Sequence, residues 1–144
     1  MQEMENRAPI LTAHYRERAD HFFIAMQHLA SDLHFAKTSV ALLAVHSAIS
    51  LNDAIMVAIT GRRGKDSEHG KAALELGRLC TRLKIKSTHG VQHLSWLLSN
   101  KTDIAYGERR LDDSFLKMSV EKAERFSNWA YTTFREVLRF EQGA

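Results

Sequence analysis

Cations and glycines are concentrated in one short stretch of the chain, Thr60 to Gly70, which reads TGRRGKDSEHG. Its basic side chains are Arg62, Arg63, Lys65 and His69. Glycine lets the backbone approach a ligand closely, and the first turn of a following helix presents unpaired amide groups. Arginine adds a fixed charge and a planar fork of donors that fits phosphate. The stretch predicts an anion-binding turn, although a solvated loop between helices has the same composition.

A polar stripe crosses the most apolar segment of the sequence. Ser39, His46, Ser50 and Asp53 follow one another at spacings of seven, four and three, which places them on one face of a helix. A buried carboxylate is costly without a partner, so we expect Asp53 to be mostly buried and paired with a base. The candidate partners are Arg62, Arg63, His69 and Lys101. A structural ion pair and a functional one both fit this pattern.

Lys101 and Tyr106 lie in the segment SNKTDIAYG, at the end of a predicted helix. The aliphatic stem of Lys101 either covers apolar surface or carries its ammonium to Asp53 or to a phosphate. Tyr106 adds a phenol to the same end. We therefore include Lys101 and Tyr106 with Asp53 and the basic turn as candidate ligand-binding residues.

Two histidine patterns raise the question of a metal. His14, His21 and His28 recur every seven residues, and a step of seven is about 10 Å along a helix, too far for one ion. His89 and His93 have the spacing of a zinc pair, but the sequence offers no third ligand. Phosphate-binding loops and dinucleotide fingerprints are also missing from the sequence. We expect no metal and no cofactor.

The elements that must position these residues are helices. Apolar side chains recur at threes and fours over 11–35, 37–59, 89–106 and 113–140, and a further helix follows Asp66 or Ser67 and ends near Lys86. Alternation typical of strands is lacking. The sequence predicts one all-α domain over 1–144, an antiparallel bundle of about five helices, with a flexible segment at 1–10.

Composition restricts the class of protein. The chain has 144 residues, a formal net charge of +3 and one cysteine, which fits a reducing cytoplasm, and its start has no apolar leader. The apolar run from 40 to 59 is interrupted by His46, Asn52 and Asp53, so we interpret it as a buried helix and not a membrane span. Because that helix is apolar around nearly its whole circumference, we expect a homodimer.

Four segments together resemble HEPN domains, in particular small bacterial HEPN-like proteins. They are AVHSAISLNDAI, GRRGKDSEHGKAALEL, LLSNKTDIAYG and SVEKAERFSNWAYTTF, within 40–134. The resemblance implies a helical bundle, frequently dimeric, from toxin–antitoxin, defence or RNA-processing systems. Catalytic members are metal-independent ribonucleases with an arginine, often followed by asparagine, and a histidine four to six residues on. Here Ser99, Asn100, Ile104 and Tyr106 stand at that place, so arginine and histidine are missing.

Three functions follow from the residues and the resemblance. The first is an interaction module for a nucleotide, an RNA or a protein partner such as a nucleotidyltransferase. The second is a metal-independent ribonuclease of the toxin or defence type, with Arg63 and His69 as catalytic residues at the family's spacing. The third is a structural partner or antitoxin subunit, in which the same polar residues only stabilise packing.

Overall fold

The protein is an all-α bundle, as the sequence predicts. The computed structural model describes residues 2–31, 36–63, 71–107 and 111–139, and every regular element in these ranges is a helix. The helices are α1 (Gln2–Ala30), α2 (Lys37–Thr60), α3 (Lys71–Arg82), α4 (His89–Ser99), α5 (Lys101–Tyr106), α6 (Asp113–Thr133) and α7 (Arg135–Leu138). Five predicted helices become seven because the fourth is divided at Asn100 and the last at Phe134.

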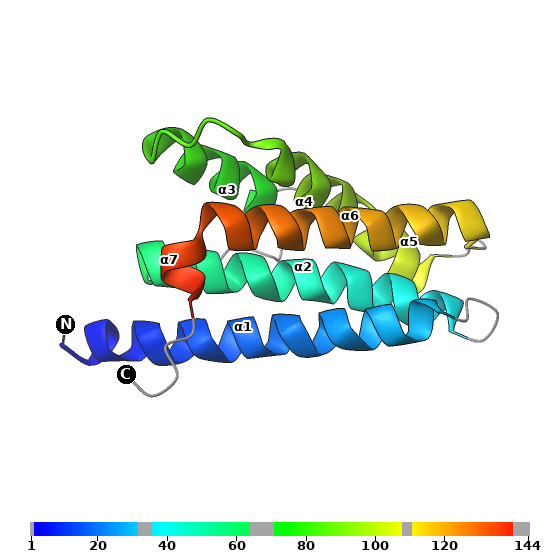
Figure 1. Ribbon diagram of the computed structural model, residues 1–144, viewed down its shortest axis with the longest axis horizontal. Coiled ribbons are helices and arrows are strands. Elements are labelled where there is room, and N and C mark those ends of the chain that lie inside the picture. Colours follow the sequence, from blue (N-terminus) through cyan, green and yellow to red (C-terminus); the bar gives the residue numbers. More distant parts are fainter. Residues whose placement is uncertain (1, 32–35, 64–70, 108–110, 140–144) are drawn as a thin grey trace.

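The central element is α2, which contacts all six other helices. In Figure 1, α1 lies along one side of α2 and α6 along the other, while α3, α4 and α5 form the remaining side. By length and composition α2 could cross a membrane, but 67% of its most apolar window is buried by the protein itself. This burial is that of a core helix. The homodimer predicted from this helix stays a prediction.

The first helix begins at Gln2, earlier than the predicted start near Leu11. Pro9 lies inside it, where the ring lacks the amide donor of a helical hydrogen bond and crowds the carbonyl one turn earlier, a cost that this part of the helix bears. Its buried side chains, Thr12, Ala19 and Met26, recur every seven residues. Since α1 makes its most extensive contact with α2, this row is the face that packs on the core.

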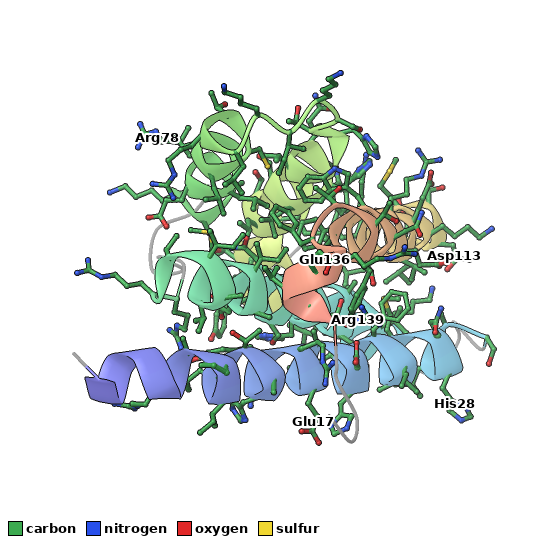
Figure 2. The ribbon with its side chains drawn as sticks, turned by 60° about the vertical axis from the view of Figure 1, so that its left-hand side comes forward. Glu17, His28, Arg78, Asp113, Glu136 and Arg139 are labelled. Atoms are coloured by element: carbon green, nitrogen blue, oxygen red, sulfur yellow. The ribbon has the colours of Figure 1, made fainter. Side chains whose placement is uncertain are left out.

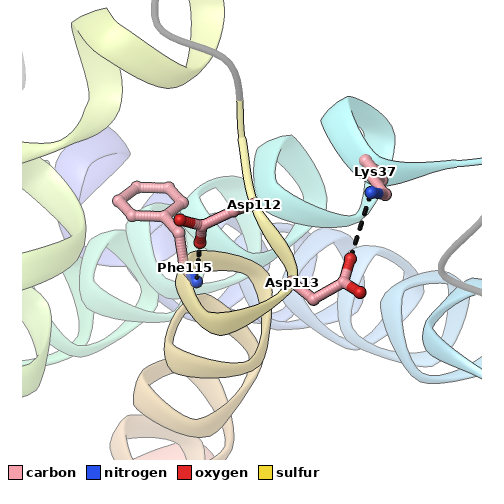
Figure 3. A network of polar contacts seen from close by, with 4 residues as sticks. All are labelled: Lys37, Asp112, Asp113 and Phe115. Atoms are coloured by element: carbon pink, nitrogen blue, oxygen red, sulfur yellow. Dashed lines mark hydrogen bonds and ion pairs between the residues drawn. The ribbon is translucent and has the colours of Figure 1, made fainter.

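The start of α6 shows how local chemistry fixes a helix boundary. Asp112 is the N-cap, and its carboxylate accepts a hydrogen bond of 2.8 Å from the amide of Phe115 (Figure 3). The next residue, Asp113, forms an ion pair of 3.0 Å with Lys37 at the start of α2. Both of these side chains are partly exposed, so the pair orients the two helix ends more than it stabilises them.

Close approach of α4 and α6 depends on a glycine. A Cβ atom at Gly90 would lie 2.0 Å from Cδ2 of Trp129, so the indole occupies the space of that missing side chain. The indole Nε1 of Trp129 donates a 2.8 Å hydrogen bond to the carbonyl of Ser87, just before α4. The apolar contact with Gly90 and the hydrogen bond from the indole together hold α4 against α6.

Candidate anion-binding cleft

The described residues among those predicted to bind a ligand lie in different parts of the bundle. Arg62 and Arg63 are exposed immediately after Gly61, which ends α2 in the left-handed conformation with φ 76°. Lys65 and His69 lie outside the described residues. Asp53 is buried, with 5% of its surface exposed, as predicted, while the identity of its basic partner stays a prediction.

Lys101, the first residue of α5, lies away from the end of α2 that carries Arg62. Burial first, and then the charges of Lys101 and Arg18, lower the pKa of His46, which places Lys101 beside the early part of α2. Sixteen residues separate His46 from Arg62, or about 24 Å along the helix. Tyr106 ends α5 with 87% of its surface exposed. The described part of the chain therefore does not gather Lys101 and Arg62 into one pocket.

The polar stripe on α2 is only half buried. Ser50 and Asp53 are buried, but Ser39 and His46 are exposed. The ring of His46 rests against Phe22 of α1, with the centroids 5.7 Å apart. Helical spacing predicted the shared face correctly, but it did not show where α1 stops covering α2.

The histidine pair on α4 does not form a metal site among the described residues, where no group of three potential ligands occurs. His93 is buried, and its Nδ1 atom has no hydrogen-bond partner among the residues that the structure describes. Nδ1 of the exposed His89 lies 2.7 Å from Oγ of Ser87. Burial, followed by the nearby charge of Lys122, lowers the pKa of His93. A neutral imidazole is thus built into the contact between α4 and α6.

A more complete polar site lies where α1, α6 and α7 meet. At Phe134 the chain leaves the α6 helix, with φ −110° and ψ 32°, and forms the short α7. Phe134 stays buried against Trp129, with ring centroids 5.6 Å apart, and Leu138 is buried as well. Nη1 of Arg16 donates a 3.4 Å hydrogen bond to the carbonyl of Leu138 and so connects α1 to α7.

The break creates an open cleft of about 690 Å³, which we name the arginine cleft. Figure 2 shows Glu136 and Arg139 at the place where α7 approaches α1. The cleft is lined by Arg16, Asp20, Tyr131, Thr132, Arg135, Glu136, Leu138 and Arg139. Its volume falls in the range of small-molecule sites.

A tyrosine and an aspartate anchor the wall of the arginine cleft. The hydroxyl of Tyr131 donates a short hydrogen bond of 2.5 Å to Oδ1 of Asp20. Burial, the hydrogen bond and the negative charge of Asp20 raise the pKa of Tyr131 far above that of a free phenol, and Arg16 opposes them. Tyr131 is therefore neutral at physiological pH, and it is a poor general acid or base there.

The arginines give the cleft its chemistry. Three arginines and two acidic residues line the cleft, and one of the carboxylates, Asp20, already accepts the hydrogen bond of the Tyr131 phenol. Arg135 and Arg139 are exposed, and within the described part of the chain neither has an ion-pair partner. Guanidinium groups that converge on a cleft suit a phosphate or carboxylate ligand, which they can bind through two parallel hydrogen bonds.

Sequence reasoning missed this cleft, although a signal was present. Arg16 and Asp20 are four residues apart on α1 and share a helix face, and Tyr131 and Arg135 have the same spacing on either side of the break at Phe134. What the spacing did not show is that the two pairs oppose each other, because 111 positions separate Asp20 from Tyr131.

No protein-family model matches the chain, and no curated protein or solved structure does either. The resemblance to HEPN domains therefore stays a prediction from the sequence.

Proposed function

We propose that this protein is a binding module for a phosphate-bearing ligand of about the size of a mononucleotide, held in the arginine cleft. The observation that carries the proposal is the convergence of Arg16, Arg135 and Arg139 on one open cleft of about 690 Å³. A binding role is favoured over catalysis because the one phenol in the cleft is held neutral and engaged by Asp20. A cytoplasmic location and a HEPN-like ancestry remain parts of the proposal.

The test is the affinity of a fluorescently labelled mononucleotide, with inorganic phosphate as the competitor. We expect Arg135→Gln and Arg139→Gln each to weaken binding by about tenfold or more, since a charge-assisted hydrogen bond contributes about 1.5–3 kcal/mol. The affinity should also fall as salt rises.

Arg78→Gln is the matched control. Arg78 is an exposed arginine on α3, on the far side of the bundle from Arg139 (Figure 2), so its removal changes the net charge by the same amount. Equal losses in the control and the cleft variants would mean that general charge attracts the anion, and the cleft proposal would fail. Absence of binding by the unmodified protein at low salt would also overturn it.

The ribonuclease alternative is tested separately. Arg63 is exposed at the end of α2, where RNA could reach it. If Arg63 and His69 cut RNA, labelled RNA is cleaved in the presence of EDTA and both Arg63→Ala and His69→Ala abolish cleavage. Cleavage that persists in these variants, or no cleavage in the unmodified protein, would remove this alternative without affecting the arginine cleft.

A further inference from the structure

The solvent-facing side of α1 carries a regular row of six side chains that neither the core nor the arginine cleft uses. We name it the outer row, and it consists of Ile10, His14, Glu17, His21, Ile24 and His28. All six residues are exposed. Ile10 and Ile24 are 71% and 62% exposed, the highest values among the exposed large aliphatic side chains of the described residues.

The outer row points directly away from the bundle. The core-facing row of α1 is Thr12, Ala19 and Met26. Position 19 lies midway between Glu17 and His21, on the opposite face of the helix. Figure 1 shows α1 at the edge of the bundle, and in Figure 2 the side chains of Glu17 and His28 extend outward from it.

The spacing of the outer row keeps its members on one face of α1. They follow at intervals of four, three, four, three and four, 18 residues in five steps, and this average of 3.6 residues is the period of a straight helix. Two largely exposed isoleucines, placed two turns to either side of Glu17, give this row apolar surface that a partner helix can cover.

The side chains of the outer row complement those of a second copy of α1 that runs in the opposite direction. In an antiparallel pair of α1 helices, Ile10 opposes His28 of the second copy, since their numbers add to 38. The same sum pairs His14 with Ile24 and Glu17 with His21. Each isoleucine then packs on an imidazole, and the carboxylates at the centre face imidazoles. Within one helix Oε1 of Glu17 already lies 3.8 Å from Nε2 of His21.

A parallel pair is less favourable. It would place Glu17 against Glu17 of the second copy, and like charges directly opposed are destabilising. We therefore infer that two copies of this protein associate through the outer rows of their α1 helices, packed antiparallel. The inference does not rest on ligand binding, so either proposal can fail alone.

Sedimentation equilibrium tests the association from micromolar to millimolar protein. We expect a reversible dimer. Its dissociation constant should rise about tenfold or more in the double variant Ile10→Lys/Ile24→Lys. Both side chains are mostly exposed, so these changes leave the fold intact, which a denaturant melt checks. Met118→Lys, a change at an exposed side chain of α6, should leave the dimer unaltered. A monomer throughout, or a dimer insensitive to Ile10→Lys/Ile24→Lys, would overturn the inference.

Disulfide trapping tests the antiparallel register. Mixing Ile10→Cys protein with His28→Cys protein should give a covalent heterodimer under mild oxidation. Ile10→Cys alone should stay uncrosslinked, because its two copies would be about 27 Å apart along the pair. Cys80 is fully buried and does not interfere. Efficient crosslinking of Ile10→Cys to itself would show a parallel pair and contradict the inference.

Discussion

Tyr131 and Asp20 form the residue contact with the clearest dependence on pH. The folded-state pKa of Tyr131 is raised, so the hydrogen bond to Asp20 contributes its full stability below the pKa of an unfolded tyrosine, about 10. This contribution is lost as pH rises above that value toward the folded pKa. We expect Tyr131→Phe to lower the free energy of unfolding by about 1.5–3 kcal/mol at pH 7. The difference from the unmodified protein should shrink above pH ~10. Urea melts from neutral to alkaline pH measure both, and a difference that does not change with pH would contradict the raised pKa.

At the scale of elements, the two helical glycines Gly90 and Gly77 provide a matched pair. Alanine at position 90 would drive its Cβ into the ring of Trp129 and push α4 away from α6, so we expect a loss of about 1–3 kcal/mol or more. At position 77 on α3, the nearest atom, Cγ1 of Val91, would be 3.7 Å away, an ordinary contact. Gly77→Ala should therefore stabilise the protein by about 0.5–1 kcal/mol through helix propensity. Denaturant melts compare the two variants. Equal effects would mean that the indole of Trp129 does not hold α4 in place.

At the scale of the whole molecule, the bundle is unevenly held together. The helix α2 contacts every other helix, whereas α3 contacts only α4 and α2 among the helices described. Opening α3 should therefore expose less apolar surface than unfolding the rest. We expect native-state hydrogen exchange to show α3 amides opening at least about 2 kcal/mol below the global free energy of unfolding, with α2 amides near the global value. Equal protection of α2 and α3 would show a single cooperative unit instead.

The sequence by itself determined the helical class and the identity of the central helix. Apolar spacing is a local property, and the burial of Leu76, Leu79 and Cys80 on α3 follows from it. The predicted third helix extends to near Lys86, but α3 ends at Arg82, and Leu83 just after it is 45% exposed. Periodicity continues through a helix end when the next residue happens to be apolar.

The tertiary structure alone decided the arginine cleft and the free face of α1. The cleft needs the break at Phe134. After the break, Leu138 is buried and α7 lies against α1. This packing depends on residues of α1, which are more than a hundred positions away in the sequence. Similarly, the sequence shows the seven-residue repeat of His14, His21 and His28, but not which side of α1 the core would take. Contacts between distant segments decide these features, and local spacing carries no information about which helix faces will meet.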